Sequence, residues 1–271
     1  MLHSCQIRPK KLPGQHLLTW LLTLFSLCAG ASEPLQIPAD LAQRIGQKIW
    51  QNEGLGKVEN LTAWNQGEEF PSLGIGHFIW YPAGVDGPFS ESFPALLDFI
   101  GNSTPLPPWL TDQRDAPWSD RTAFYADIDS PRMEQLRTFL LDTIPQQTRF
   151  IVERLQASLA KMTATLDSAQ QRDKVEREFN RLARSPQGLY ALIDYVNFKG
   201  EGTSPKERYQ NEGWGLLQVL LAMDDDSTDP VAAFVQAANR ILTRRVELAP
   251  GDEQRWLPGW RKRVRSYLGN L

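Results

Sequence analysis

The second half of the chain is a series of helical patterns separated by short breaks, and this feature constrains the fold most. Apolar residues recur there with helical spacing, which predicts helices over 131–142, 146–166, 168–184, 187–196, 205–223, 229–246 and 252–268. The predicted breaks fall at Pro145, Pro186, Gly200–Gly202, the acidic run 224–226 and Pro250-Gly251. The acidic run lacks the spacing of a calcium loop, so we expect a helix end there, followed by a cap at Asp229.

The first 130 residues are less regular. A helix is predicted from Asp40, its cap, to about Asn52, and a short helix over 93–100. Between them, residues 60–81 carry short segments punctuated by Gly and Asn, which indicate a small hairpin or three-stranded sheet. The proline-rich stretch 104–118 predicts an ordered surface loop. Without an internal repeat, the simplest fold is one α+β domain, predominantly α, over 32–271.

The first 31 residues resemble a secretory signal. A basic start is followed by an apolar run from Leu17 to Leu27 and by the small residues 29–31. The run is shorter than the roughly 20 residues of a spanning helix, so we expect cleavage after Ala31, with an uncleaved anchor as the alternative. Lipidation at Cys28 is disfavoured because Leu27, which is not small, precedes it. The protein is therefore predicted to be exported, periplasmic or secreted, with no membrane contact after cleavage.

Cleavage changes the inventory of reactive residues. Removing 31 of the 271 residues leaves 240, with no cysteine, with His77 as the one histidine, and with 26 basic against 32 acidic residues. Thiol chemistry, disulfides and zinc sites built on His and Cys are then excluded, and we expect no metal and no cofactor. Neither a G-x-S-x-G elbow nor a phosphate-binding loop occurs. Carboxylates are the natural candidates for catalysis.

One constellation of residues carries such chemistry. Trp50-Gln51-Asn52-Glu53-Gly54 closes the first predicted helix, Leu61-Thr62-Ala63-Trp64 follows, and then comes Ser72-Leu73-Gly74-Ile75-Gly76-His77. In its order and spacing this run resembles the active-site segment of the phage-type lysozymes, with Ser72 in place of a threonine. Two later segments resemble the same family, Ala191–Gly200, with one extra residue before its glycine, and Leu257–Val264, whose closing Glu is missing. Residues 82–185 have no counterpart and are expected to be a helical insertion.

The resemblance implies a lysozyme-like fold and a glycosidase that cleaves the glycan strand of peptidoglycan. Glu53 would be the general acid, in a partly apolar setting that raises the pKa of such a group. The family places an aspartate where this chain has Gln66. Glu69 could supply the second carboxylate, or a single carboxylate could act as in lytic transglycosylases. Ser72 would position a water or support the sheet.

Sugar rings stack on aromatic side chains, and aromatic residues gather around this motif. We expect glycan contacts from Trp64, Asn65, Trp80, Tyr81, Asn197, Tyr209 and Gln218. Gly215–Val219 is similar to a segment of lytic transglycosylases and is expected to begin a helix that lines the cleft. Gly74 and Gly76 alternate, as on one face of a strand, where a backbone or a ligand could approach closely. His77 is expected to make a structural hydrogen bond.

Other functions stay open. The chain could bind or scaffold the cell wall without catalysis, as the missing aspartate suggests, or cleave a related glycan such as chitosan or chitin. Eight basic residues lie between Arg240 and the C-terminus, a charge that could meet an anionic polymer or simply face solvent. Nucleic acid is not expected for an exported protein without a recognised motif. We expect a monomer.

Overall fold

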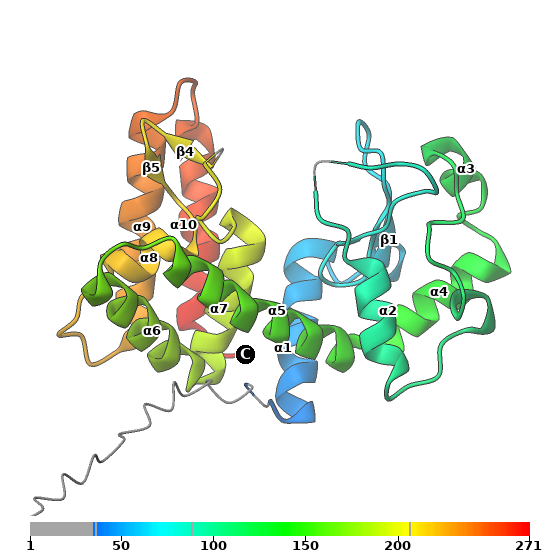
Figure 1. Ribbon diagram of the computed structural model, residues 1–271, viewed down its shortest axis with the longest axis horizontal. Helices are drawn as coiled ribbons and strands as arrows, with labels where there is room; N and C mark the ends of the chain where they lie inside the picture. The colour runs from blue at the N-terminus through cyan, green and yellow to red at the C-terminus, as the bar shows by residue number, and fades with distance from the viewer. Residues whose placement is uncertain (1–34, 36, 88, 206) are drawn as a thin grey trace, which may run out of the picture. The chain divides into compact units, whose positions relative to one another are not determined.

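The computed structural model of the protein describes residue 35 and residues 37–87, 89–205 and 207–271 (Figure 1). The predicted signal at 1–31 lies outside the described residues. Helices dominate the described chain: α1 Ala39–Gly54, α2 Phe93–Gly101, α3 Arg121–Ala126, α4 Pro131–Asp142, α5 Ile144–Ala164, α6 Ala169–Ala183, α7 Pro186–Lys199, α8 Leu216–Ala222, α9 Pro230–Leu248 and α10 Leu257–Arg265. Short 3-10 turns lie at Val58–Leu61, Pro108–Leu110, Gln254–Trp256 and Ser266–Leu268.

Two small antiparallel sheets complete the fold. β1 (Thr62–Ala63), β2 (Ser72–Leu73) and β3 (Phe78–Ile79) form a sheet in sequence order, with Leu73 opposite Thr62 and Phe78. β4 (Arg208–Tyr209) and β5 (Glu212–Gly213) form a separate hairpin. The prediction of an α+β fold, predominantly α, with a small sheet after the first helix is confirmed in this form.

Helix starts follow from local sequence. Three helices begin with a proline whose preceding side chain caps the helix: the hydroxyls of Ser130 and Ser185 accept from Met133 and Gly188 N–H, and the Asp229 carboxylate accepts from Val231 N–H. Proline fits the first turn because its missing N–H would have no partner there. The break predicted at Pro186 is therefore a helix start, the predicted cap at Asp229 is confirmed, and so is the predicted helix 131–142.

The predicted helix over 205–223 is wrong in its first part. Residues 208–213 form the β4–β5 hairpin, whose two turn residues Gln210 and Asn211 have φ of 50° and 67°. Two successive residues with positive φ make the hairpin turn that matches strand twist, and Asn accepts this conformation readily. The helix α8 begins only at Leu216.

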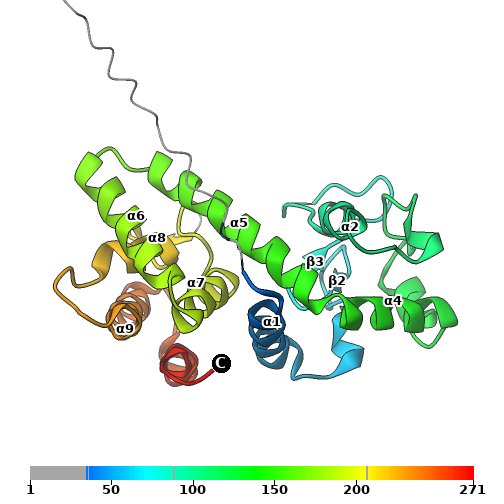
Figure 2. The ribbon, with the colours of Figure 1, turned by 90° about the horizontal axis from the view of Figure 1, so that it is seen from below.

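Helix α5 links the sheet region to the C-terminal helices. It contacts α1, α2, α6 and α7, and Figure 2 shows it running from beside α6 at one end to α4 at the other. One hydrophobic cluster includes Leu73 of the sheet, Ile151 of α5, Leu192 of α7 and Phe234 of α9. The stretch 82–185, predicted as an insertion, therefore contributes to the shared core.

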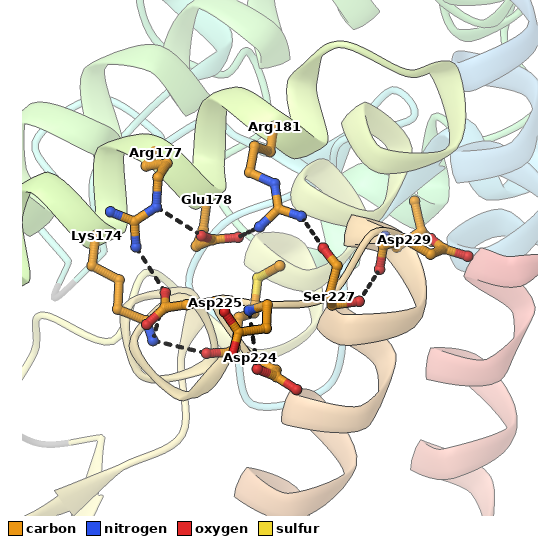
Figure 3. Close-up of polar contacts among 11 residues, drawn as sticks. Lys174, Arg177, Glu178, Arg181, Asp224, Asp225, Ser227 and Asp229 are labelled. Atoms are coloured by element: carbon orange, nitrogen blue, oxygen red, sulfur yellow. Dashed lines mark hydrogen bonds and ion pairs between the residues drawn. The ribbon is translucent and has the colours of Figure 1, made fainter.

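A charged cluster attaches α6 to the segment between α8 and α9 (Figure 3). Glu178 is fully buried and accepts from Arg177 (3.2 Å) and Arg181 (2.8 Å). Arg177 and Lys174 also pair with the exposed Asp225 at 2.7 and 3.1 Å. Cations of α6 thus bind the acidic run 224–226. The sequence suggests only a solvated helix end there.

Replacing Glu178 by Ala should destabilise the fold strongly. The change removes the carboxylate that accepts from Arg177 and Arg181, and a hydrogen bond to a charged group contributes about 1.5 to 3 kcal/mol. The free energy of unfolding measured in urea would show the loss. Asp225→Ala is the matched control, since its partly exposed ion pairs are screened by water and its loss should change stability little. Equal effects of the two variants would contradict this assignment.

Candidate functional site

Glu53 lies at the C-terminal end of α1, where the chain leaves the helix. Leu55 has a left-handed conformation (φ 53°), which ends the helix. The Gly54 carbonyl accepts from the Asn60 amide at 3.0 Å, which fixes the exit toward β1. The Glu53 side chain is 23% exposed, and its Oε1 accepts from Nη2 of Arg263 on α10. Its Oε2 makes no hydrogen bond within the described part of the chain.

The cation beside Glu53 is shared with a second carboxylate. Arg263 donates from Nε and Nη2 to the two oxygens of Asp194 on α7, at 2.8 and 2.9 Å. Asp194 is 1% exposed and also accepts from Tyr267 (2.6 Å) and from Asn52 (3.1 Å). Burial opposes the charge of Arg263, but its bonds to Asp194 and Glu53 hold its pKa above the usual value. Burial and Asp194 together raise the pKa of Tyr267.

A cavity of about 240 Å³ lies between the β2–β3 turn, α5 and α7. Polar groups on its walls include His77, Arg154, Ser158, Asn197 and Glu201. The Ser158 hydroxyl donates to Oε1 of Glu201 at 2.5 Å, and that carboxylate lies 3.8 Å from Lys161. Asn197, predicted as a glycan contact, is exposed here, whereas Glu53 does not line this cavity.

The turn that borders this cavity is fixed from α5. Gly74 has φ 69°, and residues 74–77 form the turn between β2 and β3, so the prediction that Gly74 and Gly76 lie on one strand face is wrong. The fully buried Gln147 accepts from Ile75 N–H at 2.9 Å. A Cβ on Gly74 would lie 2.3 Å from Oε1 of Gln147, so both the backbone conformation and the close approach require glycine.

Several predicted site residues belong to the core or to loops. Trp64 and Trp80 are 2% and 0% exposed, and their indole N–H groups donate to Glu68 and Arg114 carbonyls, so their rings are inaccessible in this structure. Tyr81 is also buried and its hydroxyl donates to the Phe89 carbonyl. These three side chains pack in the interior and offer no exposed ring face to a ligand.

The polar residues predicted in and beside the first sheet differ in burial: Ser72 is buried, whereas Asn65 and Glu69 are exposed. Ser72 is buried in β2, opposite Ala63 and Ile79. Asn65 is exposed and its amide donates to the carboxylate of Glu68 at 3.1 Å. Glu69 is exposed. No contact within the described residues joins Glu69 to Glu53.

Gln218 and Tyr209 have structural partners near the β4–β5 hairpin. The Gln218 side chain accepts from Gly215 N–H and donates to the Gly202 carbonyl, both at 3.0 Å. The Tyr209 hydroxyl donates to Glu253 at 2.8 Å, and this bond is the main cause that raises the pKa of Tyr209. Gln218 thus fixes the segment after α7, and Tyr209 anchors the hairpin to the α9–α10 connection.

Cations and aromatic rings stack on one another next to Arg263. Its Cζ lies 4.6 Å from the centre of the Phe198 ring, and Nζ of Lys199 lies 4.1 Å from that ring and 3.5 Å from the Trp260 ring. Cζ of Arg245 lies 4.9 Å from the centre of the Trp260 ring, and its guanidinium pairs with Glu253 at 2.8 Å. Cations over aromatic faces are stabilised by the ring quadrupole.

Sequence reasoning missed Asp194, Arg263, Lys199 and Glu201 as members of a site. Asp194 and Arg263 lie within the two later segments that resemble the phage-type lysozymes, so those segments held a usable signal. Among the described residues, no group of His, Cys, Asp and Glu is arranged to hold a metal ion. None of the described helices combines the length and apolar character needed to cross a bilayer.

Comparisons of the chain with protein-family models, with curated proteins and with solved structures found no match.

Lys199 should make stability depend on pH. Burial, with Arg245 and Arg263, lowers the pKa of Lys199 from 10.5 to about 7, although Glu253 opposes this. Between these values the unfolded chain binds more protons than the folded one, so this group's contribution makes the free energy of unfolding rise with pH. Lys199→Met should remove that rise, measured by urea unfolding from about pH 6 to about pH 10. The exposed Lys57→Met is the control. A wild-type-minus-variant difference that is constant over this range would mean that the aromatic rings keep Lys199 charged.

Proposed function

We propose that the protein is an exported, monomeric glycosidase of lysozyme-like fold that cleaves the glycan strand of peptidoglycan, with Glu53 as the general acid. The observation that carries the proposal is the setting of Glu53 at a helix end, where one carboxylate oxygen accepts from Arg263 and the other has no partner among the described residues. The order of helix, Glu53 and three-stranded sheet along the chain supports it, since the resemblance to phage-type lysozymes implies this order.

Sharing of Arg263 with Asp194 makes a protonated Glu53 tolerable. A general acid must exist in its protonated form without great cost, yet an ion pair stabilises the ionised form. Here Arg263 keeps a bidentate contact with Asp194, so a proton on Glu53 would not leave a buried guanidinium unpaired. Glu53 can then give that proton to a glycosidic oxygen from Oε2.

The second carboxylate of a lysozyme-type reaction has no clear counterpart. Gln66 occupies the expected position, and Glu69 is exposed without a contact to Glu53. A one-carboxylate mechanism fits this arrangement better: Glu53 protonates the leaving oxygen and then accepts the proton of the sugar's own 6-hydroxyl as that oxygen attacks the anomeric carbon. The products would be anhydro-sugar ends, as lytic transglycosylases form. A contribution of Ser72 through a water would require access that its burial limits.

Glu53→Gln should abolish release of soluble muropeptides from purified peptidoglycan. Loss of a general acid lowers the rate by at least about 100-fold, while the fold should persist because Gln can still accept from Arg263. Chromatography with mass spectrometry measures the products, and anhydro ends differ from reducing ends by one water. Glu59→Gln, an exposed control beside the same turn, should retain activity. Glu69→Gln separates the mechanisms, since full activity supports the one-carboxylate route. Undiminished activity of Glu53→Gln would refute the assignment.

A second candidate is binding of the cell wall without catalysis. The observation in its favour is that Glu53 is already paired with Arg263 and that, among the described residues, no second carboxylate contacts Glu53. Sedimentation with purified cell walls distinguishes the two functions. Co-sedimentation of the wild-type protein without any soluble product would favour the scaffold, whereas product formation that Glu53→Gln abolishes would favour the enzyme.

A further inference from the structure

A basic groove lies between α9 and α10, and the proposed function does not use it. The groove has a volume of about 620 Å³. Its lining residues are Asn239, Arg240, Thr243, Arg244, Glu247, Arg261 and Arg265. Four arginines and one glutamate give this surface a net positive charge, although the whole chain carries a net charge of −3. The local excess of positive charge is therefore a property of this groove.

Three of its four arginines lack a carboxylate partner among the described residues. Arg240 donates to the Ala222 carbonyl at 2.6 Å, and Arg261 donates to the Thr243 hydroxyl at 2.9 Å. Arg265 is exposed, and its side chain has no hydrogen bond or ion pair with the described chain. Neutral acceptors hold the first two guanidinium groups in place without compensating their charge. Such preorganised cations are suited to an incoming anion.

The fourth arginine behaves differently. Arg244 pairs with Glu212 of β5 at 2.8 Å and with Glu247 at 3.3 Å. Arg245, the next residue, pairs with Glu253 outside the groove. Among the described residues, Arg244 and Arg245 thus have carboxylate partners, whereas the other three arginines of the groove have none.

Helix stabilisation does not explain these cations. A cation near a helix C-terminus interacts favourably with the helix dipole, but this effect is confined to the last turn. It accounts for Arg265, which ends α10. Arg240 lies eight residues before Leu248, the end of α9, and Arg261 lies in the middle of α10. Their charge requires another cause.

The spacing of the arginines fits an extended peptide as the ligand. Arg240 and Arg244 are four residues apart on α9, as are Arg261 and Arg265 on α10. Four residues of helix rise about 6 Å. In an extended peptide, side chains on one face recur every second residue, or about 6.6 Å. Carboxylates at alternate positions of an extended peptide would therefore meet Arg261 and Arg265 along α10. On α9 only Arg240 is available to such a peptide, because Arg244 is already paired.

We propose that the groove between α9 and α10 binds an extended acidic peptide segment of a partner protein, with carboxylates at alternate positions facing Arg240, Arg261 and Arg265. The charge of Arg244 is compensated by its two glutamates, so the site comprises the three other cations. This proposal does not depend on glycosidase activity, because none of its residues contacts Glu53 or lines the cavity beside α5.

Fluorescence anisotropy with the full chain tests the proposal. The first probe is a labelled peptide of alternating Asp and Ser, and the second has the same residues in two blocks. The alternating peptide should bind more tightly, and its binding should weaken as salt screens the charges. Equal affinity for both peptides, or no binding of either, would overturn the proposal. Tighter binding of a labelled oligothymidylate than of the alternating peptide would also overturn it, in favour of nucleic acid.

Variants locate the site. The triple variant Arg240→Gln, Arg261→Gln, Arg265→Gln keeps side-chain donors near Ala222 and Thr243 but removes the charge. It should bind the alternating peptide at least about tenfold more weakly. The control triple Arg44→Gln, Lys57→Gln, Arg184→Gln removes the same charge from exposed positions elsewhere and should bind like the wild type. Equal weakening in both triples would show attraction by net charge alone and would contradict the proposal. Thermal unfolding of all proteins verifies that each is folded.

Discussion

The buried carboxylate of Asp194 is the interaction on which the candidate site depends. A charge removed from water is tolerated only when it is paired and hydrogen-bonded. Asp194 meets this condition with partners from distant parts of the chain, Asn52 on α1, Arg263 on α10 and Tyr267 just after it. The first and last helices are therefore held against α7 by one charge. The same Arg263 that pairs with Asp194 also supplies the cation beside Glu53.

A second constraint connects the sheet to α5. The turn between β2 and β3 has no long strands to define it, because each strand has only two residues. Its shape comes instead from Gln147, which accepts from Ile75 N–H and donates to the Leu140 carbonyl at 2.6 Å. A buried amide must satisfy both ends, so it transmits the geometry of α4 and α5 to the turn. His77, with φ 49° at the end of that turn, thereby lies beside the cavity.

The fold was predictable where local sequence decides it. The helix from Pro131 could be bounded because Ser130 and the proline specify its start by themselves. The first helix likewise ends at Gly54, close to the end predicted near Asn52. The hairpin at 208–213 could not be predicted in this way. Two-residue strands show no alternation, and a helical pattern of apolar residues continues through them.

The site was predictable only in part. Glu53 and its place at a helix end followed from a motif within one segment, whereas its partner Arg263 comes from the other end of the chain. Long-range pairing of this kind leaves no periodic signal. Aromatic residues near the motif suggested sugar stacking, but Trp64 and Trp80 are core residues with bonded N–H groups. Composition alone does not separate an aromatic residue that packs inside from one that faces a ligand.

One cation, Arg263, is shared by two carboxylates at the candidate site. Arg263 carries one positive charge between the carboxylates of Glu53 and Asp194, so this group of three has an excess of one negative charge when all are ionised. Asp194 accepts from three side chains and is enclosed, whereas Oε2 of Glu53 has no partner in the described chain, so Glu53 is the carboxylate that keeps an oxygen free for a ligand. Lys199, next to Phe198 on which Arg263 stacks, adds a further cation to these surroundings, and burial lowers its pKa to about 7. The ion pair with Arg263 therefore engages only one oxygen of Glu53 and leaves the other for the proton transfer proposed above.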